Sequence, residues 1–121
     1  RTNIQTLMIG GYIWKGSYSV TGEFIEPMLE KLSFNKYFTS PACVGKNGEL
    51  MYYTIQTSGL RELVAERSEE TIVVADSSKF GRTGFVTNGN LSDIQILVTD
   101  RVPEDFQAKV PPRVVLVDSG E

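Results

Sequence analysis

The sequence predicts an α/β fold in which a mostly parallel sheet is flanked by helices. Short apolar runs of strand length alternate with segments whose apolar residues recur at helical spacing, an alternation typical of βαβ units. Each run is followed by glycine or polar residues that can turn the chain. The clearest strand-like runs are residues 7–9, 71–75, 94–99 and 114–117.

The first run, residues 7–9, ends at Gly10-Gly11, and a helix is expected after it. Thr21 is its predicted N-cap, because a threonine hydroxyl can accept a free N–H of the first turn. Pro27 fits this helix only if the regular part starts near it, since proline has no N–H to donate. The residues predicted to share one helical face are Phe24, Ile25, Met28, Leu29 and Leu32.

A weaker strand is predicted over residues 37–44. Pro41 interrupts it, and because proline cannot donate to a sheet ladder, the strand should lie at an edge or end there. Residues 45–48, Gly-Lys-Asn-Gly, then predict a surface turn, since Asn-Gly pairs are frequent in β-hairpins.

A second helix is indicated by the spacing of Leu60, Leu63 and Val64, with Thr57 or Ser58 as its N-cap. It leads directly into the strand at residues 71–75, whose unbroken apolar run predicts burial on both faces.

A short third helix is expected after Pro103, carrying Phe106 and Val110. Pro111-Pro112 would end it before the last strand.

Composition narrows the functions open to this chain. At 121 residues it has the length of one domain, and an apolar content of 40% can supply a core. The net charge of −3 provides no basic surface for nucleic acid, so we expect DNA to be bound only by another segment. The chain opens at Arg1 without an initiator methionine, which predicts a fragment of a longer protein.

The absence of histidine removes His-based triads and the commonest zinc ligand. Cys43 is the single cysteine, which rules out an internal disulfide and fits a reducing compartment. No apolar run is long enough to span a membrane. We therefore expect a cytoplasmic protein without metal or cofactor.

The segment after residues 71–75 carries the best candidate chemistry. Asp76, Ser77, Ser78 and Lys79 follow that strand directly. Ligands of open α/β sheets bind at the carboxyl ends of the strands, so these groups would suit a small polar anion there. Two alternatives stay open: Asp76 can accept backbone N–H groups within the turn, and Lys79 can be solvated. Arg61 is a further candidate, because a cation in the first turn of a helix opposes the dipole and invites an anion.

Together with other positions, these residues resemble the C-terminal sensor domain of DeoR-type repressors of sugar metabolism. The resemblance extends from Leu7 to about Val117. Its most specific part combines Asp76-Ser77-Ser78-Lys79-Phe80-Gly81 with Ile94, Val98, Thr99 and Asp100. Its other features are Ile9-Gly10-Gly11, Gly22, Phe38, Gly48 and Leu91.

The resemblance implies a ribose-5-phosphate-isomerase-like fold that binds a phosphorylated sugar and so changes how a separate N-terminal helix-turn-helix holds DNA. It also implies that residues 1–121 are a partial sensor domain, lacking that helix-turn-helix and the first strand-loop-helix of the sensor. No catalytic residue is expected, and Arg61 stands where the family usually has lysine. The ligand-binding residues implied are Lys79, Asp76, Ser78, Arg61 and Gly48.

Two other functions stay open. The related isomerases share the D-x-S-K element but need a carboxylate base at the start of the helix, where this chain has Arg61 with Glu62 one residue away. We favour a non-catalytic sensor. The chain could also be chiefly an oligomerisation module, and a homo-oligomer is expected. In the sensor, a sugar phosphate would shift the oligomer toward the arrangement that it binds better.

Overall fold

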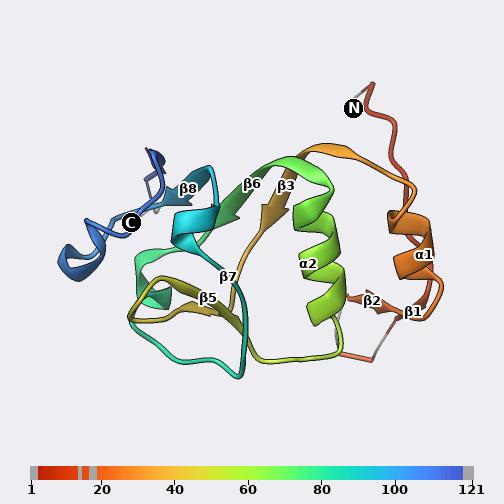
Figure 1. Ribbon diagram of the computed structural model, residues 1–121, viewed down its shortest axis with the longest axis horizontal. Coiled ribbons are helices and arrows are strands. Elements are labelled where there is room, and N and C mark those ends of the chain that lie inside the picture. Colours follow the sequence, from red (N-terminus) through yellow and green to blue (C-terminus); the bar gives the residue numbers. More distant parts are fainter. Residues whose placement is uncertain (1–2, 14, 17–18, 119–121) are drawn as a thin grey trace.

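The computed structural model of this chain describes residues 3–13, 15–16 and 19–118. Its larger sheet has four strands in the order β3-β6-β8-β9, and every neighbouring pair runs parallel (Figure 1). The expected mostly parallel α/β fold is therefore confirmed. The strands are β3 (Phe34–Thr39), β6 (Ser68–Val74), β8 (Ile96–Thr99) and β9 (Arg113–Leu116).

A smaller antiparallel sheet has the strand order β4-β5-β7. Its hairpin turns at residues 45–48, as the Asn-Gly pair predicts, and Gly48 there has a φ of +86°. A separate two-stranded hairpin precedes the first helix. These strands are β4 (Cys43–Val44), β5 (Glu49–Tyr52), β7 (Val86–Asn90), β1 (Tyr12–Ile13) and β2 (Val20–Thr21).

Short helices connect the strands. The longest is α2 (Ser58–Glu66), which lies against β3, β6 and β7, with α1 (Ile25–Leu29) beside it (Figure 1). Single 3₁₀ turns follow three of the strands or their loops: η1 (Ser77–Lys79), η2 (Leu91–Asp93) and η3 (Glu104–Phe106). Because η1 follows β6 directly, it lies at the carboxyl end of the parallel sheet.

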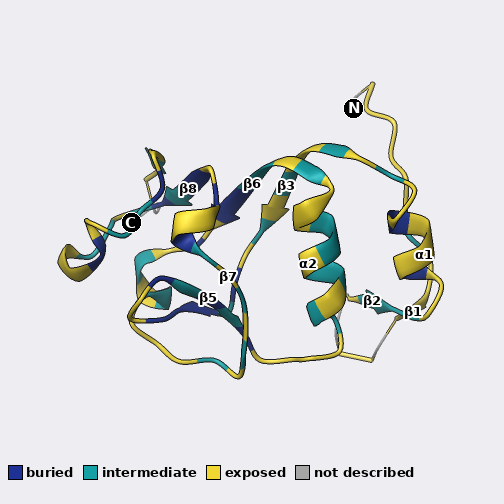
Figure 2. Cartoon of the chain, in the orientation of Figure 1, coloured by how far each residue is buried: buried dark blue, intermediate teal, exposed yellow. Residues whose placement is uncertain are grey.

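The core lies between the two sheets. Val73 and Leu97 of the parallel sheet are fully buried, and they belong to one cluster with Val44 and Leu50 of the antiparallel sheet. Phe106 of η3 packs into the same cluster. In Figure 2 the buried residues lie along β6 and β5, whereas α2 has none. The carboxyl ends of β6 and β8 are thus fixed by the best-packed part of the molecule.

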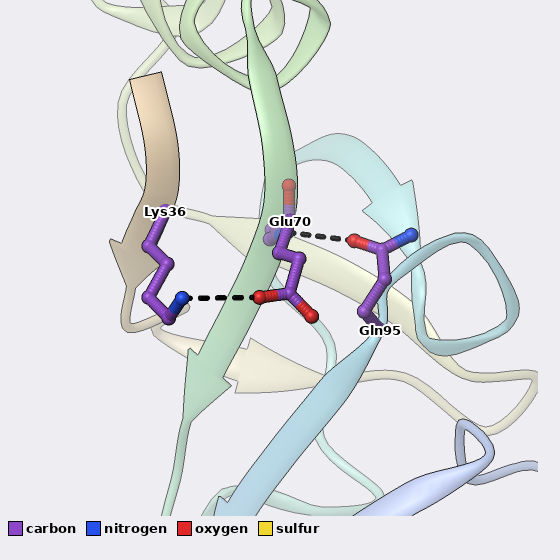
Figure 3. Close-up of polar contacts among 4 residues, drawn as sticks. Lys36, Glu70 and Gln95 are labelled. Carbon is purple, nitrogen blue, oxygen red and sulfur yellow. Dashed lines mark hydrogen bonds and ion pairs between the residues drawn. The ribbon is translucent and has the colours of Figure 1, made fainter.

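The opposite face of the parallel sheet is partly open. Phe38 and Val74 on this face are 64% and 43% exposed. At the other end of the strands, Lys36 Nζ lies 3.3 Å from Glu70 Oε1 across β3 and β6 (Figure 3). The Gln95 side chain accepts the Thr71 N–H at 2.7 Å in the same view, where it extends the ladder between β6 and β8.

The strand predicted at residues 7–9 is wrong. Those residues form no strand, and Leu7 and Met8 are 68% and 77% exposed. A strand needs a neighbour for its backbone groups, and in the described part of the chain none pairs with this segment. Apolar character alone therefore did not identify a strand here.

The predicted cap of the first helix is also wrong. Thr21 belongs to β2, and α1 begins at Ile25 with Phe24 at the N-cap position and no side-chain cap bond. Pro27 is the third residue of α1, within the first turn, where the missing N–H has no intrahelical partner to lose. The second helix begins as predicted, with Thr57 at the N-cap position, but the Thr57 side chain makes no cap bond and accepts instead from Arg61.

The predicted strand at residues 37–44 divides around Pro41. β3 ends at Thr39 in the parallel sheet, and β4 begins at Cys43 in the other sheet. After Pro103 the chain forms only the single turn of η3, so Phe106 is buried there while Val110 lies beyond it. The strands at residues 71–75, 94–99 and 114–117 are confirmed as β6, β8 and β9, with small shifts of their ends.

Candidate functional site

The turn after β6 is held by its own first carboxylate. Asp76 has extended backbone angles and stands at the N-cap of η1. Its Oδ1 accepts the Ser78 N–H at 2.9 Å and also accepts the Ser78 hydroxyl. This is the Asx-turn that the sequence left open as one role for Asp76.

A second carboxylate reaches the same turn from the neighbouring strand. Asp100 follows β8, and its Oδ1 accepts the Ser77 N–H at 2.7 Å while its Oδ2 accepts the Ser77 hydroxyl at 3.2 Å. The buried Thr99 hydroxyl lies 3.2 Å from the Arg101 carbonyl oxygen, to which it donates. Carboxylates at the ends of two parallel strands therefore fix η1 from both sides.

Both carboxyl groups have pKa values below their ordinary range. The bonds from the Ser78 hydroxyl and the Ser78 N–H lower the pKa of Asp76. The Ser77 N–H is the largest cause of the lowered pKa of Asp100. Each bond favours the ionised form, so the turn carries two negative charges at neutral pH.

Lys79 ends this braced turn with a free ammonium group. Its side chain is half-buried, and among the described residues no hydrogen bond or ion pair reaches its Nζ, although its charge helps to lower the pKa of Asp76. The chain after it is anchored, because Gly81 donates its N–H to the Val44 carbonyl oxygen at 2.8 Å. The Phe80 ring meets Phe106 edge to face, with centroids 5.0 Å apart. Lys79 is thus held between fixed residues while its charge stays available.

A cavity of about 440 Å³ opens at the carboxyl ends of β6 and β8. Its polar lining comes from the turn and the end of β8, namely Asp76, Ser77, Ser78, Thr99 and Asp100. The structure therefore brings Asp76 and Ser78 together in this cavity, whereas Lys79 lies on the same turn but does not line the cavity. We call this region the η1 site.

Arg61, by contrast, lies in another cavity, which shares no lining residue with the first. Its guanidinium donates to Asn88 Oδ1 at 2.9 Å, to Thr57 Oγ1 at 2.6 Å and to the Thr54 carbonyl at 2.8 Å. It also lies 3.8 Å from the centroid of the Tyr52 ring. These contacts tie α2 to β5 and β7.

Gly48 lies in the β4–β5 turn. Its carbonyl accepts the Leu91 N–H at 2.8 Å, and a Cβ added at Gly48 would lie 2.8 Å from Asn90 Oδ1. Both its positive φ and this close approach require glycine for the turn itself. The structure does not bring Gly48 or Arg61 to the η1 site.

From the sequence, Ser77 was placed among the polar groups of the turn, but Asp100 was assigned no role in the site. Asp100 entered only as one of the positions that resemble the family. The signal was nevertheless present: Asp76 and Asp100 both end apolar runs that become adjacent parallel strands, so their side chains should meet at one edge of the sheet.

Within the residues that the structure describes, no group of three or more potential ligand side chains is placed to hold a metal ion. In that same part of the chain, no helix combines the length and the apolar character that crossing a bilayer requires.

Comparison with known proteins identifies the family to which this sequence is similar. The family described as the DeoR C-terminal sensor domain matches residues 1–101. The chain is 32% identical over 100 residues to YulB, an uncharacterized HTH-type transcriptional regulator of Bacillus subtilis, a match covering 83% of this chain and 39% of that protein. It is 32% identical to a lactose phosphotransferase system repressor of Streptococcus mutans, covering 85% of this chain and 41% of the repressor.

A third relative is the L-fucose operon activator of Haemophilus influenzae. It is 28% identical, and the match covers 88% of this chain and 43% of the activator. The chain thus spans less than half the length of each of these relatives.

Proposed function

Because this chain belongs to the DeoR C-terminal sensor domain family, we propose that it senses a phosphorylated sugar for a transcriptional regulator of sugar metabolism. The names of two relatives support this, since one activates an L-fucose operon and another represses a lactose phosphotransferase system. The bound sugar would change how a separate helix-turn-helix holds DNA. That coupling is a difference in ligand affinity between two arrangements of the regulator.

The observation that best supports the η1 site is the free ammonium of Lys79 on a rigid turn. A lysine ammonium binds phosphate as a compact point charge, and holding it in place before binding lowers the entropic cost. Asp76 Oδ2 and the Ser78 hydroxyl would contact the sugar hydroxyls. We assign Arg61 and Gly48, which the resemblance had also implied, to holding the fold rather than the ligand.

We propose that the domain is not an enzyme and uses no cofactor. An isomerase of the related kind would need a carboxylate base at the start of the helix before β6, where this chain has Arg61. Glu62, the nearest candidate along the chain, lines the cavity of Arg61 and not the η1 site, and its Oε1 accepts the Asn88 amide at 3.2 Å. As part of a transcription regulator, the domain would act in the cytoplasm.

We also propose self-association of the regulator. Exposed apolar side chains support it: Leu7, Met8 and Phe38 are 68%, 77% and 64% exposed. In the described part of the chain, β3 and β9 are the two edges of the parallel sheet, so a second copy could also pair there. Sedimentation of the full-length protein at several concentrations would show a single monomeric species if this is wrong.

The sensing proposal is tested by calorimetric titration of the full-length protein with a panel of sugar phosphates. Lys79→Ala should weaken the best ligand at least about tenfold, the loss of roughly one charged contact. Lys31→Ala is the matched control, since Lys31 is an exposed lysine just after α1.

Equal binding by the wild type and Lys79→Ala would remove Lys79 from the site. Conversion of ribose 5-phosphate by the wild type would replace the sensor with an isomerase.

A further inference from the structure

A second cavity lies between α2 and the two sheets, and the sensing proposal does not use it. We call it the α2 cavity. Its volume is about 340 Å³, at the small end of the range for ligand sites. The floor is apolar, formed by the buried side chains of Leu50, Tyr52 and Ile94. Polar side chains from β3, β6, β7, η2 and α2 stand around it.

The polar wall of the α2 cavity is already rigid without a ligand. Arg61 is fixed by three hydrogen bonds and by the Tyr52 ring, and the Tyr52 hydroxyl lies 3.0 Å from Thr39 Oγ1. The Asn88 amide in turn donates to Ser58 Oγ at 2.9 Å and to Glu62 Oε1 at 3.2 Å. A ligand would therefore meet Arg61, Tyr52 and Asn88 already in place, whereas the exposed carboxylates of Glu66 and Asp93 would be ordered on binding.

The remaining hydrogen-bonding capacity of this wall is mostly that of acceptors. Among the described residues, none donates a hydrogen bond to the carboxylates of Glu66 or Asp93, and both line the cavity. Glu62 adds a third carboxylate, against the single guanidinium of Arg61, of whose five N–H groups three are engaged. The wall thus needs a ligand that donates hydrogen bonds and carries no negative charge.

We infer that the α2 cavity is a second ligand site, for a small uncharged polyhydroxy compound of monosaccharide size. Its hydroxyls would donate to Glu66 and Asp93, and its C–H face would pack on Tyr52 and Leu50. A phosphate group is disfavoured, because three carboxylates oppose one cation that is already engaged. At the η1 site two carboxylates also outnumber the cation, but there the ammonium of Lys79 has no hydrogen bond or ion pair among the described residues, so the two sites differ in whether their cation is available.

The test compares neutral sugars with their anionic phosphates and cationic amino derivatives. The full-length protein is titrated calorimetrically at pH 7 with glucose, galactose and mannose, with their 6-phosphates and with the corresponding 2-amino sugars. At least one neutral sugar should bind with a Kd of about 1 mM or tighter. Ala65→Phe, which puts a ring at the exposed mouth of the α2 cavity, should weaken it at least tenfold, while Lys79→Ala should leave it unchanged.

Two further variants keep the result interpretable. Ala108→Phe is the control, because Ala108 is an exposed alanine after η3 that does not line the α2 cavity. If Ala65→Phe does not fold, the double variant Glu66→Ala/Asp93→Ala replaces it, since both side chains are exposed. That variant should also weaken the neutral sugar at least tenfold.

Three results would overturn the inference. They are binding of none of the neutral sugars, binding of a neutral sugar that the α2-cavity variants leave unchanged, and selective binding of the amino sugars there. Loss of phosphosugar binding in Lys79→Ala bears only on the η1 site, so failure of one proposal can be distinguished from failure of the other.

Discussion

The α2 cavity and the η1 site each present a cation, and the two cations are used in opposite ways. The guanidinium of Arg61 donates hydrogen bonds to Asn88, Thr57 and a backbone carbonyl, whereas no described residue forms a hydrogen bond with the ammonium of Lys79. Both were reasonable anion contacts from sequence. The difference shows that a cation near a cavity suggests a ligand only after its hydrogen bonds within the protein have been counted.

The largest effect should come from Arg61→Ala. Loss of three hydrogen bonds and the Tyr52 contact should lower the free energy of unfolding by about 2–3 kcal/mol, discounted for the partial exposure of Arg61. Urea denaturation followed by circular dichroism measures it. Arg82→Ala, at an exposed arginine, should change it by less than about 0.5 kcal/mol. Equal stability of the two variants would mean that the contacts of Arg61 do not stabilise the fold.

Gly48→Ala should have the next largest effect. The substitution forces a side chain into a positive φ and against Asn90, so about 1–2 kcal/mol of stability should be lost. Phosphosugar affinity should not change, because Gly48 belongs to the β4–β5 turn. Gly59→Ala is the control, as a Cβ there meets nothing within 4 Å. A loss of affinity at unchanged stability would return Gly48 to the ligand site.

Acid should destabilise the wild-type protein more than a variant in which both carboxylates of the η1 site are replaced by amides. The folded-state pKa values of Asp76 and Asp100 are both lowered, so their contribution to stability is complete above the unfolded value of about 3.9 and is lost as pH falls through the lower folded values. Thermal unfolding midpoints below about pH 4 should therefore fall more steeply for the wild type than for Asp76→Asn/Asp100→Asn. Parallel curves would mean that these carboxylates do not brace the turn.

The smallest effects should come from exposed charges. Lys36→Ala breaks an ion pair whose side chains are 53% and 38% exposed, so stability should change by about 0.5 kcal/mol or less. Lys79→Ala should be equally neutral for stability while weakening the ligand, which is the sharpest contrast with Arg61. A large loss of stability in Lys79→Ala would show that its ammonium serves the fold.

The parallel strands were predictable because their signal is local. β8 and the second half of β6, residues 72–74, are runs of branched apolar residues, a composition typical of buried parallel strands, although Val74 is 43% exposed on the open face. β5 and β7 gave no such signal, since Glu49–Tyr52 mixes charge with apolar residues and Val86–Asn90 is mostly polar. Their pairing depends on the turn at Gly48 and on contacts with distant strands.

The site divides in the same way. The bond from the Ser78 N–H to Asp76 spans two residues and could be anticipated from the turn chemistry. The bond from the Ser77 N–H to Asp100 spans 23 residues and needs the register of β6 against β8. The position of Arg61 needs still more, because Asn88 reaches it from another sheet.

The buried thiol of Cys43 gives this chain a built-in probe of local opening. Cys43 is the single cysteine, it is fully buried in β4, and the adjacent Val44 holds Gly81 just after Lys79. A thiol reagent can reach it only when β4 opens, so the labelling rate counts those openings without any introduced probe. A ligand that holds Lys79 in place would lower the labelling rate of Cys43. A ligand in the α2 cavity would change that rate only through β5.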